Sequence, residues 1–133
     1  MSARSDSPMQ IALAQLNPLL GDCLGNAERI YTAAVEAQQK GASLMLTPEL
    51  SLTGYPPEDL LLRPSFIGEA ANVLNSLAVR LENLVGLTVI VGHPYQSTAG
   101  LHNAASVIEG GKIIATYCKQ ILPNNEEIGR AHV

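Results

Sequence analysis

Two side chains in this chain of 133 residues have the types and positions that acid–base chemistry needs. Glu49 follows Pro48 at the end of a short apolar segment, residues 43–47, and Lys119 ends a second segment, residues 112–119. A positioned carboxylate can act as a general base, and a lysine held beside it can stabilise a developing oxyanion. The plainer alternative is a carboxylate that caps a loop or pairs with a surface cation, and a lysine that ends a strand in solvent.

The cysteines and two of the histidines are expected to be structural. Cys118 immediately precedes Lys119, so in a strand their side chains point to opposite faces, and Cys118 is then a small core residue. Cys23 lies near a predicted helix start, which can lower the pKa of a thiol, but no base stands nearby and packing is favoured. His93 and His102 are expected to flank a loop, and no second ligand stands at a spacing that suits a metal.

Composition narrows the class of protein. Hydrophobic residues make up 47% of the chain, which is enough to build a core, and the formal net charge is −4 without a lysine–arginine cluster. This balance gives no reason to expect a nucleic-acid or anionic-membrane partner. The first eight residues hold no apolar core of the kind that a secretory signal has. We therefore expect a soluble, cytoplasmic domain or a part of a larger one.

The apolar pattern predicts alternating strands and helices. Strands are expected over residues 9–16, 43–47, 87–92, 101–109 and 112–119, and helices from residue 22 or 26 to 40 and over 64–84. A loop with one apolar turn at residues 60–62 fills 48–63, and Gly110-Gly111 suits a two-residue hairpin. The order β-α-β-α-β-β-β predicts an α/β fold whose parallel sheet turns antiparallel at the hairpin.

This arrangement places Glu49 where ligands bind in open α/β sheets, in the crevice beyond the carboxyl ends of the strands. The loop over residues 53–59 is expected to be pre-shaped, because Pro56-Pro57 restricts Tyr55 and Pro56 to extended conformations. We expect Tyr55 to lie near the mouth of the site.

Three separated segments carry a resemblance to a known family. They are IALAQLNPLLGD at residues 11–22, TPELSLTGYPPEDLLLR at 47–63 and YCKQILPN at 117–124. In this order they resemble the nitrilase, or carbon–nitrogen hydrolase, family over about residues 9–126. The resemblance implies an α-β-β-α sandwich, of which this chain would hold the N-terminal part.

The resemblance also implies roles for particular residues. Glu49 would be the general base and Lys119 the stabiliser of the tetrahedral intermediate, while the nucleophilic cysteine would come from beyond this chain. Tyr55 and Asn125 are the candidate substrate-binding residues, although the family often has a tyrosine where Asn125 stands. No metal is implied.

Within the family, the GYPPEDLL loop after Glu49 resembles the N-terminal glutaminase domain of glutamine-dependent NAD+ synthetases. Ammonia released from L-glutamine would pass to a C-terminal synthetase domain, which uses ATP and Mg²⁺ to amidate nicotinic acid adenine dinucleotide. The glutaminase domain itself would need no cofactor, and the complete protein would form a homo-oligomer. The alternatives are a stand-alone amidase of the nitrilase type and a non-catalytic, nitrilase-like binding module.

The ends of the chain are expected to differ from its body. Residues 1–8 are polar and are predicted to be a disordered leader, and residues 9–126 form the family domain. Residues 127–133 are predicted to be a non-native tail, because codons for 128–133 can be written to resemble a common sequencing adapter. Without the family's nucleophile and second sheet, the chain as written is expected to be inactive and poorly soluble.

Overall fold

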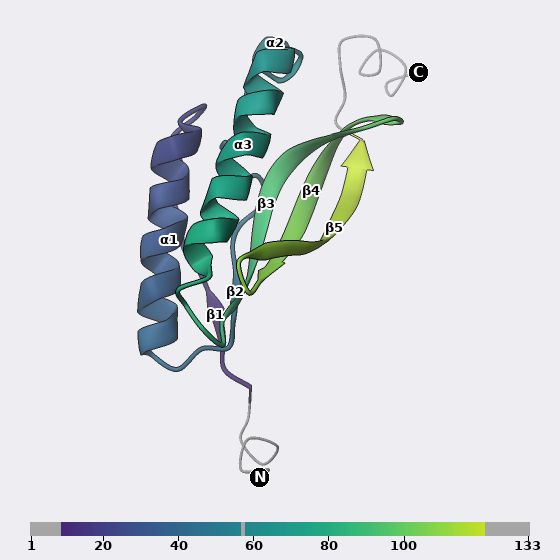
Figure 1. Cartoon of the computed structure of the whole chain (residues 1–133). Helices are drawn as coiled ribbons and strands as arrows, with labels where there is room; N and C mark the ends of the chain where they lie inside the picture. The colour runs from purple at the N-terminus through teal and green to yellow at the C-terminus, as the bar shows by residue number, and fades with distance from the viewer. Residues whose placement is uncertain (1–8, 57, 122–133) are drawn as a thin grey trace.

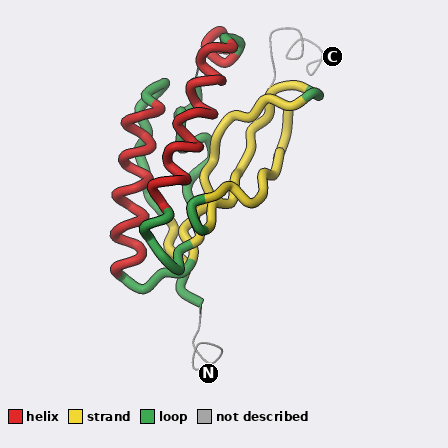
Figure 2. The backbone as a smooth tube through the Cα atoms, in the orientation of Figure 1, coloured by secondary structure: helices red, strands yellow, loops and turns green. Residues whose placement is uncertain are grey.

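The computed structural model describes residues 9–56 and 58–121, which form a layer of helices on one face of a β-sheet (Figure 1). The elements in chain order are β1 (Ile11–Leu13), α1 (Cys23–Gln39), β2 (Leu44–Leu46), α2 (Glu58–Leu61), α3 (Pro64–Leu81), β3 (Thr88–Ser97), β4 (Gly100–Glu109) and β5 (Lys112–Ile121). The two long helices lie side by side, and the tube in Figure 2 shows the strands gathered beside them.

The sheet has five strands in the order β1-β2-β3-β4-β5. β1, β2 and β3 are parallel, and β3, β4 and β5 are antiparallel. The sheet therefore does change from parallel to antiparallel, but between β3 and β4, one strand before the Gly110-Gly111 hairpin at which the change was expected. Parallel neighbours need a long crossover, which α1 and α3 supply. Gly110 and Gly111 have φ values of 61° and 82° and make the predicted two-residue hairpin between β4 and β5.

The helices form where the apolar spacing predicts them. Asp22 caps α1 by accepting a hydrogen bond from the Gly25 amide at 3.0 Å, and Pro64 begins α3, where its missing amide hydrogen does no harm. Each helix turns one apolar face toward the sheet and the other helix. The buried residues of α3 include the whole predicted stripe, Phe66, Ala70, Val73, Leu74, Leu77 and Leu81.

The strand β3 is longer than predicted, and this changes where the histidines lie. Pro94 and Gly92 argue against continuing a strand, but β2 pairs with β3 only as far as Ile90. Beyond Ile90, β3 pairs only with β4, so Pro94 lies where a missing amide hydrogen is tolerated. His93 and His102 consequently lie inside β3 and β4 and do not flank a loop, as was expected.

The other face of the sheet carries apolar side chains in contact with solvent. Because Ala12 packs with the core under the helices, its neighbours on β1 point to the opposite face. Ile11 is 52% exposed, Leu13 71% and, on β5, Tyr117 64%. In the described part of the chain, no helix is long and apolar enough to cross a membrane.

The exposed apolar face predicts association when residues 1–133 are expressed alone. Contiguous apolar patches beyond a few hundred Å² usually drive association, and we expect light scattering after size exclusion to report a mass above that of a monomer. Leu13→Lys combined with Tyr117→Lys should raise the monomer fraction. Val79→Lys, on the outer face of α3, is the matched control, because Val79 is 63% exposed but lies on the other layer. A soluble wild-type monomer would contradict the prediction.

Candidate active site

The turn that carries Glu49 leaves the end of β2 and is held against β3 by backbone and hydroxyl groups. The Gly92 amide donates to Thr47 Oγ1 at 3.1 Å, and the Leu52 amide donates to the Gly92 carbonyl at 3.1 Å. Gly54 closes the turn by donating to the Leu50 carbonyl at 2.7 Å. Leu50 itself has a φ of 50°, a strained conformation for a residue with a side chain. The backbone around Glu49 is therefore tightly constrained.

Gly92 allows this turn to approach the sheet. A Cβ atom at residue 92 would lie 2.4 Å from the Pro48 carbonyl oxygen and 2.7 Å from the Leu50 nitrogen. Both of these are backbone atoms, which cannot move aside as the end of a flexible side chain can. The glycine is thus required by the close contact between the Glu49 turn and β3.

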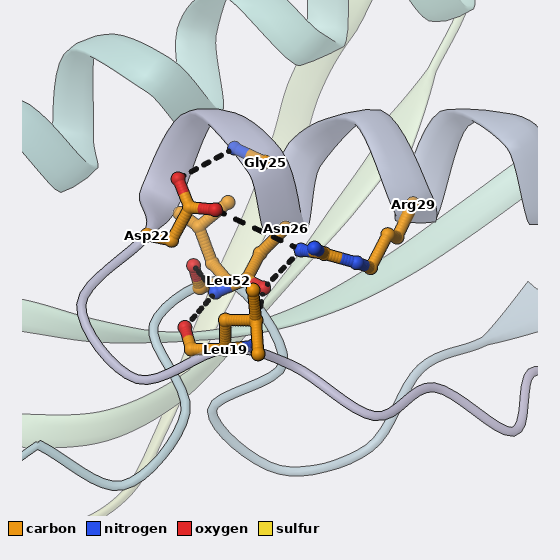
Figure 3. A network of polar contacts seen from close by, with 6 residues as sticks. All are labelled: Leu19, Asp22, Gly25, Asn26, Arg29 and Leu52. Atoms are coloured by element: carbon orange, nitrogen blue, oxygen red, sulfur yellow. Dashed lines mark hydrogen bonds and ion pairs between the residues drawn. The ribbon is translucent and has the colours of Figure 1, made fainter.

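Asn26 on α1 ties the start of the helix to the same region (Figure 3). Its side-chain nitrogen donates to the carbonyls of Leu19 at 2.8 Å and Leu52 at 3.0 Å, and its oxygen accepts from the Leu19 amide at 2.8 Å. Asn26 is 1% exposed, so these bonds are shielded from water. The loop after Glu49 is therefore anchored to the helix layer as well as to the sheet.

Glu49, Lys119 and Tyr55 meet at this edge of the sheet. Lys119 Nζ lies 3.8 Å from Glu49 Oε2, and Tyr55 Oη donates a hydrogen bond to Glu49 Oε1 at 2.7 Å. The Glu49 and Lys119 side chains are 42% and 53% exposed, so water screens their attraction. Such an exposed ion pair adds little to the stability of the fold, but a carboxylate and an ammonium group held this close can take part in acid–base chemistry.

The neighbouring groups favour the ionised form of the Glu49 carboxyl. Hydrogen bonds from Tyr55 and then Asn103, with a smaller contribution from the Lys119 charge, lower the pKa of Glu49 against the opposing effect of desolvation. The pKa of Tyr55 is raised, because its hydroxyl hydrogen is shared with the carboxylate. A carboxylate ionised at neutral pH is ready to take a proton.

A β-bulge presents Lys119 to the site. Asn103 pairs with Gln120 and Ala104 pairs with Cys118, so Lys119 is the extra residue on β5. Bulges redirect the side chain of the inserted residue and are common beside active sites. No feature of the sequence pattern indicated this irregularity.

Neither thiol lies in the arrangement that a nucleophile needs. Cys118 is exposed, so the prediction of a small core residue is wrong. It lies on β5, which has β4 as its one neighbour among the described strands and is the edge of the sheet. Cys23 is buried, and the pKa of its thiol rises to about 11 through burial and the nearby charges of Glu69 and Asp22. This is opposite to the lowering that a helix start can produce, and it fits the packing role.

The histidines make local hydrogen bonds. His93 Nε2 lies 2.6 Å from Ser106 Oγ, and His102 Nε2 lies 2.6 Å from Ser97 Oγ. Within residues 9–56 and 58–121, no three His, Cys, Asp or Glu side chains form a group that could hold a metal ion. Asn125, the other candidate for substrate binding, lies outside the described residues.

Comparisons with known proteins agree on one family. The family model described as carbon–nitrogen hydrolase matches residues 10–132. The chain is 46% identical over 118 residues to a glutamine-dependent NAD(+) synthetase from Synechocystis, covering 85% of this chain and 21% of that protein. It is 44% identical over 116 residues to the one from Thermotoga maritima, covering 87% and 20%.

The chain belongs to the carbon–nitrogen hydrolase family.

Solved structures of carbon–nitrogen hydrolases show the same fold. A glutamine-dependent NAD(+) synthetase from Cytophaga hutchinsonii superimposes with a TM-score of 0.78 at 28% identity, covering 89% of this chain and 20% of that one. An amidase from Nesterenkonia, solved in complex with butyramide, gives 0.70 at 29% identity, covering 91% and 46%. The sheet with helices on one face is thus part of a nitrilase fold, and the chain spans about a fifth of the length of the curated relatives it matches.

The side chain that the sequence interpretation missed in this carbon–nitrogen hydrolase is Asn103. It lies on β4, is 1% exposed, and contributes to lowering the pKa of Glu49. Within a largely apolar strand, an asparagine directly followed by Ala104 and Ala105 was a signal that a buried polar group needs a partner.

The contact at Gly92 yields a prediction for the complete protein that carries this region. Gly92→Ala should lower the free energy of unfolding by about 1–3 kcal/mol, because the new methyl group meets backbone atoms. Gly68→Ala on α3 is the control, since a Cβ there meets nothing within 4 Å and alanine favours a helix by about 0.5–1 kcal/mol. Thermal melts of both variants measure the difference, and equal melting temperatures would refute the argument.

Proposed function

We propose that this chain is the first part of a glutaminase domain that supplies ammonia to an NAD+ synthetase. The observation that carries the proposal is the approach of Lys119 Nζ to within 3.8 Å of the Glu49 carboxylate, at the end of β2. The names of the curated relatives support the choice of substrate, because they are glutamine-dependent NAD(+) synthetases at 36–46% identity.

In the proposed reaction, Glu49 acts as the general base. It takes the proton of a cysteine thiol that lies outside this chain, and the thiolate attacks the side-chain amide carbon of L-glutamine. Lys119 stabilises the negative charge on the tetrahedral oxygen, and the proton held by Glu49 passes to the leaving nitrogen, which departs as ammonia. Glu49 then activates the water that hydrolyses the thioester.

The surroundings of Glu49 support these roles. A base must be unprotonated before it acts, and the donors around the Glu49 carboxyl hold its pKa low. The site is partly open, with Glu49 42% exposed, which leaves room for a thiol and a substrate to approach. Tyr55, 67% exposed with its hydroxyl on Glu49, would border the substrate.

The remaining steps are assigned to other parts of the complete protein. Ammonia would travel to a C-terminal synthetase domain, where ATP and Mg²⁺ serve the amidation of nicotinic acid adenine dinucleotide. The complete protein would act as a homo-oligomer in the cytoplasm, and the chain as written would be inactive. Asn125 stays a candidate for glutamine contact.

A stand-alone amidase is the second candidate, favoured by the TM-score of 0.70 to the Nesterenkonia amidase. The two candidate functions differ in the fate of the ammonia that is released. An amidase releases free ammonia as an end product, whereas the synthetase consumes it, so coupled NAD+ formation from glutamine separates them.

Glu49→Gln in the complete protein should reduce glutamine-dependent NAD+ synthesis by about 10²- to 10⁴-fold, because the substituted amide cannot take a proton. Synthesis from added ammonium should largely survive, since it bypasses the glutaminase site. The control is Glu36→Gln, which breaks another glutamate–lysine pair, of 3.7 Å with Lys40, on the exposed face of α1. Glu36→Gln should behave as wild type with both nitrogen sources. Normal glutamine hydrolysis by Glu49→Gln would exclude Glu49 as the base.

A further inference from the structure

Asn103 lies on the same face of the sheet as the Glu49 turn. Directly opposite residues on paired strands turn their side chains to the same face, and so do residues two apart on one strand. Gly92 pairs with Ala105, and Asn103 is two residues from Ala105 on β4, opposite Pro94. A Cβ atom at residue 92 would point at the Glu49 turn, so the side chain of Asn103 points to that face too.

Asn103 also lies between the elements that carry the ion pair. β4 is flanked by β3, against which the Glu49 turn packs, and by β5, which carries Lys119. The bulge that presents Lys119 is opposite Asn103 and Ala104. The amide of Asn103 is therefore next to the point where Glu49 and Lys119 meet.

The two ends of the Asn103 side chain have different surroundings. Asn103 is 1% exposed and, as a hydrogen-bond donor, lowers the pKa of the Glu49 carboxyl, whereas its Oδ1 is the one buried side-chain nitrogen or oxygen in the described residues without a hydrogen-bond partner. Turning the amide around would set the oxygen against the carboxylate and bury the NH₂ group instead. An unpaired buried acceptor in a native fold calls for a reason, and donation to a charged group supplies one.

We propose that Asn103 is a positioning residue, which holds the Glu49 carboxylate beside Lys119. This inference rests on the proposed function of Glu49 as the base. It assigns to Asn103 no contact with substrate, only the orientation and ionisation of the group that takes the proton.

Among the described residues, three groups face Glu49, and they differ in how rigidly they are held. Tyr55 comes from the following loop and is 67% exposed, and Lys119 comes from β5 and is 53% exposed. Asn103 comes from the middle of β4 and is buried, so it loses the least freedom when it holds the carboxylate. Its hydrogen bond favours the ionised form, so removing it should raise the pKa of Glu49.

The test uses Asn103→Leu in the complete protein, because leucine has a similar shape and neither donates nor accepts. We expect kcat/KM for glutamine to fall about 10- to 100-fold near neutral pH, the loss typical of a hydrogen bond to a charged group. The acidic limb of the pH profile should move to higher pH, since Glu49 must lose its proton before it can act. Asn103→Ala repeats the test if leucine prevents folding.

Asn26→Ala is the matched control. Asn26 is also 1% exposed and hydrogen-bonded, but to backbone carbonyls and not to Glu49. It should lower the melting temperature and leave the acidic limb where it is in the wild type. If the Asn103 variants lose activity without any movement of that limb, Asn103 is only structural and the inference is wrong.

A second measurement does not depend on activity. The carboxyl of Glu49 can be titrated by carbon-13 NMR in glutamate-labelled protein, with its signal assigned by Glu49→Gln. A higher pKa in Asn103→Leu supports the inference, and an unchanged pKa overturns it. A wild-type protein that fails to hydrolyse glutamine would instead overturn the proposed function, so the two failures are separate.

Discussion

The close contact between the Glu49 turn and the backbone of β3 is the constraint on which the rest of the site depends. A side chain at residue 92 would lie 2.4 Å from the Pro48 carbonyl oxygen, so the turn can reach β3 only over a glycine. The amide and carbonyl of Gly92 then bind Thr47 and Leu52, on either side of the glutamate. The position of Glu49 is thus determined by the backbone of two elements, and not by the ion pair with Lys119.

Positioning by the backbone, and not by the ion pair, explains how a partly exposed carboxylate can be held in place for chemistry. The attraction between Glu49 and Lys119 is screened by water and contributes at most about 1 kcal/mol, so it cannot by itself fix either side chain. The fixed geometry comes from the buried layers below: the Asn26 bonds under the loop, the strained Leu50, and the bulge that displaces Lys119 from the strand. The stable part of the chain supports the site, and the site adds little stability in return.

The features that sequence predicts are those that local spacing determines. The α3 stripe recurs at helical spacing, Gly110-Gly111 has the backbone freedom that a two-residue hairpin needs, and Glu49 stands after a short buried strand. Each of these depends on residues a few positions apart. The approach of Lys119 to Glu49 was expected only from the family resemblance, since no local pattern connects them.

The features that sequence did not predict depend on pairing across the sheet. The continuation of β3 past Pro94 depends on where β2 stops. The bulge at Lys119 depends on the register of β4 with β5. Cys118 is exposed because β5 is the edge strand. Asn103 belongs to the same group: only the register shows that it lies between β3, against which the Glu49 turn packs, and β5, which carries Lys119.

The exposed apolar face of the sheet is also the face on which the candidate site lies. The helices cover one face of the sheet, while Glu49 and Asn103 are on the other face, where Leu13 and Tyr117 are exposed. A group placed to react with a substrate needs surroundings that exclude water, because charges act more strongly at low dielectric. The apolar side chains that make the open face prone to association are therefore suited to a second layer packed over it.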